Sequence, residues 1–146
     1  MTKSKVEEIT LIGTGKSIED AFSKVATNMF DIVIDRNSIR KINTKIIMFK
    51  SKDLKEALYM FLKKIYDITS NETFLLNEVK NISIEKMNNE YLLNAVIIGE
   101  KLSKEHIIKD IIKQVTNRNV LVKENKDGSI AQLNIVVERR NLENEI

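Results

Sequence analysis

The spacing of apolar residues along this chain changes from the period of an α-helix to that of a β-strand, and this change constrains the fold most. In the first half, two segments carry apolar residues at the i, i+3, i+4 and i+7 positions that line one helical face. The first stripe comprises Ile18, Ala21, Phe22, Val25, Ala26, Met29, Phe30 and Val33, and the second comprises Leu54, Ala57, Leu58, Phe61, Leu62, Ile65 and Tyr66. From about residue 71 onward the period is two, which is typical of strands with one buried face.

Polar residues mark where these two helices begin. Ser17 is a favourable N-cap, and Asp20 follows three residues later as the acidic partner of a capping box. Ser51 is expected to cap the second helix. We expect the first helix to end near Asp35–Asn37 and the second near Thr69–Asn71.

The remaining segments predict strands. Lys5–Ile12 reads as a strand that ends in a turn at Gly13–Gly15, and Ile42–Lys50 is rich in β-branched residues. The strands expected in the second half are 79–84, 91–98, 111–123 and 130–137, which two polar turns join into two hairpins. Segment 103–110 fits either a helical turn or an irregular loop. The tail 139–146 has little to bury and is expected to fray.

Together these segments predict an α+β fold in which two helices pack on one face of a mainly antiparallel sheet. The 146 residues predict a single domain, 1–146. The absence of Cys excludes a disulfide scaffold, a thiol nucleophile and Cys-based zinc or iron–sulfur sites. The net charge of +3 is too small to argue for nucleic-acid binding. No apolar run approaches the roughly 20 residues that span a bilayer, so we expect a cytoplasmic protein with no membrane contact.

The segment Gly13-Thr14-Gly15-Lys16-Ser17 follows a strand and opens a helix, as a phosphate-binding loop does. That loop also needs a glycine five positions before the second one, and Thr10 stands there. We therefore favour the interpretation that two glycines turn the chain and Ser17 caps a helix. A nucleotide-binding protein that uses Gly13–Ser17 remains an alternative.

Several carboxylates and a single histidine are candidates for chemistry. Asp31 and Asp35 lie near the end of the first helix, and alternation allows Glu8 and Glu138 to point toward one shared sheet edge. Oxygen-only clusters suit hard cations such as calcium or magnesium, but composition alone favours a solvated charged surface. His106 lies in a polar segment, where we expect it to be exposed. No Ser or Cys pattern accompanies it, so a catalytic triad is unsupported.

Motifs in the same order along the chain resemble those of the archease family. In that family a Gly-Glu pair ends one strand and is followed by a His and by a strand that contains Lys and Thr. The N-terminal half is also similar to the family's two helices. The segments that carry the resemblance are Gly99-Glu100, His106, Ile112-Lys113-Gln114-Val115-Thr116, Gly15 to Phe22, Asn28 to Asp31, Asp35 and Asp53 to Tyr66.

This resemblance implies a small α+β accessory protein that is not itself an enzyme. Archeases activate the RtcB-type RNA ligase, which joins broken or spliced RNA ends, by promoting guanylate transfer to the ligase's active-site histidine and allowing multiple turnovers. The implied partner is therefore that ligase, with RNA reached only through it. The family also carries a divalent-metal site built from carboxylates near the two chain ends, which implies calcium, with magnesium or manganese as alternatives.

The resemblance assigns the metal to Glu8 and Glu138, with departures from the family pattern. The usual N-terminal His-Thr-Ala-Asp is here Lys5-Val6-Glu7-Glu8, so Glu8 replaces an aspartate. The second aspartate falls on Val136 in an ungapped alignment, and on Glu138 if the preceding hairpin is two residues longer. Asn117 and Arg118 replace the aromatic residue and the His that usually follow the Thr.

The resemblance further implies that Asp31, Asp35, His106 and Lys113 share one functional face with the metal carboxylates. Lys113 would pair there with a phosphate or with Glu100. A general binding or chaperone-like module that has lost the metal site is a further alternative, since it would keep the same fold.

Overall fold

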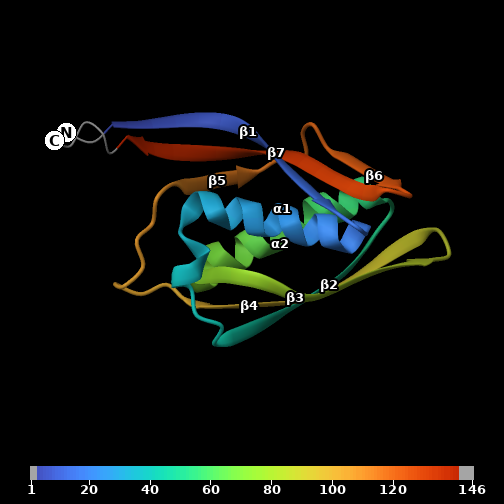
Figure 1. Ribbon diagram of the computed structural model, residues 1–146, viewed down its shortest axis with the longest axis horizontal. Helices are drawn as coiled ribbons and strands as arrows, with labels where there is room; N and C mark the ends of the chain where they lie inside the picture. The colour runs from blue at the N-terminus through green and yellow to red at the C-terminus, as the bar shows by residue number, and fades with distance from the viewer. Residues whose placement is uncertain (1–2, 142–146) are drawn as a thin grey trace.

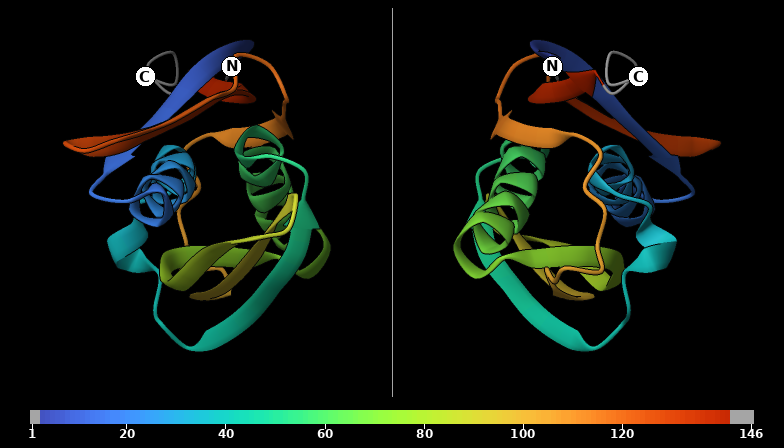
Figure 2. Two further views of the ribbon diagram at one scale, coloured as in Figure 1. Left: turned by 90° about the vertical axis from the view of Figure 1, so that its right-hand side faces the viewer. Right: turned by 90° about the vertical axis from the view of Figure 1, so that its left-hand side faces the viewer.

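Two helices lie between two antiparallel sheets in the computed structural model, which describes residues 3–141 (Figures 1 and 2). The elements in chain order are β1 (Lys3–Gly15), α1 (Ile18–Val33), the 3-10 turn η1 (Arg36–Ser38), β2 (Asn43–Ser51), α2 (Leu54–Glu72), β3 (Phe74–Met87), β4 (Glu90–Lys101), β5 (Ile111–Val115), β6 (Leu121–Asn125) and β7 (Gly128–Asn141). The predicted α+β class with mainly antiparallel strands is confirmed.

The strands divide into two sheets, one on each side of the helix pair. One sheet has the order β1-β7-β5, with β6 also paired to β7, and the other has the order β2-β4-β3. Helix α1 packs against β1, β3 and β7, whereas α2 packs mainly against β2 and β3. Figure 2 shows the helices between the two sheets. The sequence predicted helices on one face of a sheet, and the structure adds a second sheet on their other side.

Both predicted helical stripes face this layered core, and all their residues are buried except Val33, Leu54 and Tyr66, which are half-buried. Phe22 of α1 and Phe61 of α2 are fully buried, and their rings stack with centroids 6.2 Å apart. Aromatic side chains bury large apolar areas, and this stacked pair joins the two helices within the core. Leu133 and Ile135 of β7 and Ile97 of β4 close the core from the two sheets.

One predicted helix cap is confirmed and the other is wrong. Ser17 caps α1, since its hydroxyl oxygen accepts the Asp20 N–H at 3.1 Å. Asp53 caps α2 instead of Ser51, and its carboxylate accepts the Glu56 N–H at 2.8 Å. Ser51 is still paired with a β4 residue in the sheet, so the chain reaches helical geometry only after Asp53.

The predicted turn at Gly13–Gly15 is also wrong, because β1 continues through these residues. Gly13 pairs with Ala131 and Gly15 with Ser129. A Cβ at Gly13 would collide with the backbone of α1, where it would lie 2.6 Å from the Val25 nitrogen. The glycine therefore allows β1 to lie directly on α1. A strand paired in a ladder cannot wrap its amides around phosphates, so the nucleotide-binding alternative has no geometric support.

The single strand predicted over 111–123 is two strands in the structure. β5 ends at Val115 and β6 begins at Leu121, and both pair with the same side of β7. The turn between them contains Asn119 with a φ of +56°, a conformation that Asn tolerates better than most residues. Segment 103–110, left open by the sequence, has no helix or strand.

The predicted fraying from residue 139 is wrong for the part of the tail that the structure describes. Arg139 and Arg140 lie in β7 and pair with Lys5 and Ser4 of β1. Arg140 also receives support from Asp110, whose carboxylate accepts the Arg140 backbone N–H at 3.0 Å. Residues 142–146 lie outside the described residues. Within 3–141, neither helix is long and apolar enough to cross a membrane.

The close approach of β1 to α1 gives the first prediction. We expect Gly13→Ala to reduce the free energy of unfolding by about 1–3 kcal/mol, because the added methyl overpacks a site bounded by backbone atoms. Urea unfolding followed by circular dichroism measures the loss. Thr14→Ala at the adjacent exposed position is the control. Equal stability of the two variants would show that α1 does not restrict this position.

Candidate functional site

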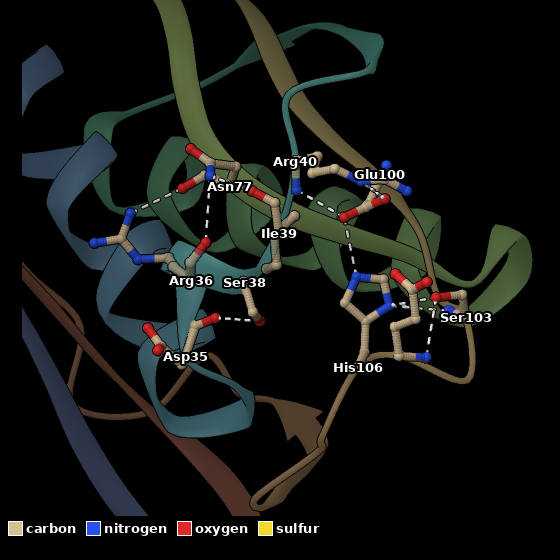
Figure 3. Close-up of polar contacts among 10 residues, drawn as sticks. Asp35, Arg36, Ser38, Ile39, Arg40, Asn77, Glu100, Ser103 and His106 are labelled. Carbon is tan, nitrogen blue, oxygen red and sulfur yellow. Dashed lines mark hydrogen bonds and ion pairs between the residues drawn. The ribbon is translucent and has the colours of Figure 1, made fainter.

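A buried acid–base cluster joins three segments at one end of the molecule (Figure 3). Glu100, at the end of β4, accepts the Arg40 backbone N–H at 2.7 Å and the Arg40 Nε–H at 3.2 Å. The Nε2 atom of His106 lies 3.0 Å from the same carboxylate. The side chains of His106 and Glu100 are only 4% and 6% exposed. The prediction that His106 is exposed is therefore wrong.

The hydrogen bonds around His106 define its protonation pattern. Its Nδ1 accepts the Ser103 backbone N–H at 2.9 Å, so the ring proton belongs on Nε2, from which it is donated to Glu100. The polar sequence around His106 predicted exposure, but a buried carboxylate 6 residues away in the chain draws the ring inward. The Arg40 backbone N–H, and after it the His106 ring, lower the pKa of Glu100.

Further backbone hydrogen bonds hold the loop that carries His106. The N–H of Leu102 donates to the Thr73 carbonyl at 2.7 Å, and the N–H of Lys109 donates to the Val33 carbonyl at 2.6 Å. The loop is thus tied to the ends of both helices. Within this loop, Ile107 remains 80% exposed. This places a large apolar side chain in solvent on a well-anchored segment.

Asp31, in α1, and Asp35, just after it, have structural partners of their own. Asp31 forms an ion pair with Arg36 at 2.6 Å, and the Arg36 guanidinium also donates to the Asn77 carbonyl at 2.8 Å. Asp35 caps η1, where its carboxylate accepts the Asn37 N–H at 3.1 Å. In Figure 3 Asp35 and Arg36 come from the η1 turn, whereas Glu100 and His106 come from β4 and the following loop.

Glu8 lies on the outer face of the β1-β7-β5 sheet, where an arginine and an asparagine bind it. Arg118 donates to both carboxylate oxygens, with Nη2 at 2.7 Å from Oε1 and Nε at 3.0 Å from Oε2. Asn134 Nδ2 donates to Oε2 at 2.7 Å. The Arg118 hydrogen bonds, followed by that of Asn134, lower the pKa of Glu8 to about 2. Glu8 in turn raises the pKa of Arg118.

The strand register determines which β7 residue faces Glu8. Val136 is directly opposite Glu8, whereas Glu138 is opposite Val6. Glu8 and Glu138 share the outer face because paired residues and residues two apart in a strand point to the same side. They are diagonal neighbours, for which Cβ atoms are about 7–8 Å apart or slightly less. The Glu138 carboxylate lies 3.7 Å from Lys113 Nζ. Lys113 therefore pairs with Glu138, so the predicted pairing with Glu100 is wrong, whereas the alternative pairing with a phosphate stays a prediction.

The predicted functional residues form two groups. Glu8, Glu138 and Lys113 lie on the outer sheet face, and Asp31, Asp35 and His106 lie at the end formed by α1, η1 and loop 102–110. Among residues 3–141, no hydrogen bond or ion pair between these six residues joins the two groups.

The donor atoms around Glu8 do not fit a divalent cation. Calcium takes six to eight oxygen ligands, and magnesium needs octahedral geometry. Here both Glu8 oxygens accept from Arg118, and the side-chain oxygen of Asn134 accepts the Thr10 hydroxyl at 2.7 Å. In the described part of the chain, no three His, Asp or Glu residues are arranged to hold a metal ion. Calcium, magnesium or manganese binding at Glu8 and Glu138 stays a prediction.

Three residues of these clusters are absent from the sequence-based prediction. Arg40 and Asn134 carry no motif, and each acts on a carboxylate 60 or more positions away. Arg118 was visible only as a departure from the family pattern. The available signal was that Arg118, at the position of the family's His, carries a charge opposite to that of Glu8.

Comparison with known families and proteins supports one assignment. The model of the archease protein family matches residues 8–137. The archease of Pyrococcus abyssi is 32% identical over 128 residues, which cover 86% of this chain and 89% of that protein. The archease of Thermococcus kodakarensis is 30% identical over 122 residues, which cover 83% and 85% of the two chains. The archease of Danio rerio is 25% identical over 125 residues, which cover 84% and 76%.

The fold also matches a solved structure. The solution structure of Methanobacterium thermoautotrophicum protein 1598 superposes with a TM-score of 0.76 and covers 90% of this chain and 96% of its own. The two sequences are 18% identical in this comparison, so the match shows the shared fold alone.

The buried Glu100 cluster gives a pH prediction. The folded-state pKa of Glu100 lies below its ordinary value of 4.5, so the ionised group stabilises the fold above that pH. The contribution is lost as the pH falls through the lowered value. We expect Glu100→Gln to unfold several degrees below the parent at neutral pH, and the gap to narrow in acid. Thermal unfolding between pH 7 and 3 measures it.

Glu105→Gln is the matched control, since Glu105 is an exposed carboxylate in the same loop. Its unfolding temperature should follow that of the parent at every pH. A Glu100→Gln gap that stays constant down to pH 3 would contradict the assignment of this contribution to the charge of Glu100.

Proposed function

Because the chain belongs to the archease protein family, we propose that it is a non-catalytic accessory protein that activates an RtcB-type RNA ligase in the cytoplasm. In this proposal it promotes guanylylation of the ligase and its multiple turnover in tRNA splicing or RNA repair. It reaches RNA only through the ligase. The observation that carries the proposal is the family match over residues 8–137.

The geometry of the signature residues supports this proposal. Gly99 has no room for a side chain, since an added Cβ would collide with the Leu75 carbonyl of β3. Glu100 follows immediately and binds both Arg40 and His106. The Gly-Glu pair and the distant His therefore form one folded unit. This unit holds loop 102–110 rigidly at one end of the molecule.

We propose that this end contacts the ligase. It exposes Ile107 on the anchored loop and carries Asp31 and Asp35 on the neighbouring helix end and η1 turn. Ile107 stands in a loop that also carries the charged residues Lys104, Glu105 and Lys109, and a large exposed apolar side chain with polar neighbours is typical of a protein contact site. Anchoring matters because a loop that is ordered before binding loses less entropy when the complex forms.

The chemical contribution of the accessory protein would come from contact and charge. A rigid charged surface at the ligase's active-site entrance can reposition phosphate groups and metal ions that the ligase itself holds. It needs no covalent step on this chain. A general binding module without a ligase partner is the second candidate, supported by the unsuitable donor set around Glu8.

A ligase assay tests the proposal directly. The RtcB-type ligase of the same organism is incubated with GTP and labelled RNA, with and without this protein, and ligase–guanylate and turnover number are measured. We expect the parent to raise both. Ile107→Asp should need a roughly tenfold higher concentration for half-maximal stimulation, because a charge replaces an apolar contact.

Ile46→Asp is the matched control, since Ile46 is 75% exposed on β2, outside the proposed contact region. It should stimulate like the parent. Equal weakening by both substitutions would contradict the proposed contact region. No stimulation by the folded parent would favour the binding-module function.

A further inference from the structure

The outer face of the β1-β7-β5 sheet, which carries Glu8, also carries positively charged side chains. Arg118 forms an ion pair with Glu8, and Lys113 forms one with Glu138, so each carboxylate has a positively charged partner. A divalent ion placed between these carboxylates would meet both positive charges at short range, where repulsion is strong. These four side chains therefore balance one another in charge without any added ion.

The position of Arg118 is organised by the turn between β5 and β6. The hydroxyl oxygen of Thr116 accepts the Arg118 N–H at 3.1 Å, and the Arg118 carbonyl accepts the Asn134 N–H at 3.0 Å. The side-chain oxygen of Asn134 accepts the Nδ2–H of Asn119 at 3.2 Å. Arg118 is thus attached to the same β7 residue whose amide binds Glu8.

The geometry of the pair is the one that guanidinium favours. Its planar fork donates to both oxygens of a carboxylate, an arrangement that lysine cannot make. The apolar side chain of Val136 occupies the position directly opposite Glu8. No second carboxylate therefore faces Glu8 across the strand pair, and the guanidinium takes the space beside it.

We propose that Arg118 replaces a divalent cation on this face, so that the chain keeps a fixed positive charge beside Glu8 and does not use a metal there. The guanidinium is an attached cation with an always-present charge, whereas a metal would depend on its concentration. Any effect of this arginine on the ligase rests on the proposed function. In that setting the accessory protein would present an arginine, and its own fold would not respond to calcium, magnesium or manganese.

The test measures thermal unfolding of the full chain with millimolar calcium, magnesium or manganese chloride, or with EDTA. The parent should show the same midpoint in all four conditions. The double variant Arg118→Gln/Lys113→Gln frees both carboxylates from their cations. We expect calcium or manganese to raise its midpoint by roughly 2–4 °C, because an ion that binds only the folded state stabilises it.

A matched double variant, Arg139→Gln/Lys123→Gln, controls for the loss of two positive charges from the same sheet. Arg139 pairs with Glu7, and Lys123 lies on β6. The unfolding midpoint of this control should not change when the cations are added. Adding Glu8→Gln to the first double variant should abolish its response, which would place the ion at Glu8.

Two results would overturn the proposal. One is a parent chain that the cations stabilise and that loses this response on Glu8→Gln. The other is a folded Arg118→Gln/Lys113→Gln variant whose unfolding midpoint the cations do not raise. The arginine would then not occupy the position of a cation. Neither measurement involves the ligase, so this inference and the proposed function can fail separately.

Discussion

The antiparallel pairing of β1 with β7 is the constraint on which most of this structure depends. It joins the two ends of the described chain from Lys3 opposite Asn141 to Gly15 opposite Ser129. The inner faces of the two strands close the core over α1, which Gly13 allows to lie in direct contact. Their outer faces hold the residues around Glu8. One register therefore determines both the packing below the sheet and the chemistry above it.

The cluster of Glu100, His106 and Arg40 depends on the layered arrangement of sheets and helices. Because two sheets enclose the helices, the ends of α1, α2 and β4 meet on one side, where loop 102–110 crosses between the sheets (Figure 1). Glu100 and His106 hold this loop from within. The residues that carry the family resemblance here, Glu100 and His106, thus have a structural role, and Ile107 of the same loop stays exposed.

On the outer sheet face, two cations accompany the carboxylates to which the family resemblance assigns a metal. The carboxylate at position 8 is retained as Glu, but Arg118 and Asn134 satisfy it from within the chain. A surface ion pair contributes little to stability in general. The main consequence of the Arg118–Glu8 pair is that a permanent positive charge lies beside this carboxylate.

The sequence by itself determined the features that depend on neighbouring residues. The apolar stripes of both helices, the Ser17 cap and the hairpin of β3 and β4 follow from periodicity and local hydrogen bonding, which act within a few positions. Only the tertiary structure decided the burial of His106 and the partners of Glu8 and Glu138. Arg118 is 110 positions from Glu8, and Asn134 is 126 positions away, so no local pattern relates them. Strand register brings these side chains together, and register is a property of the folded sheets.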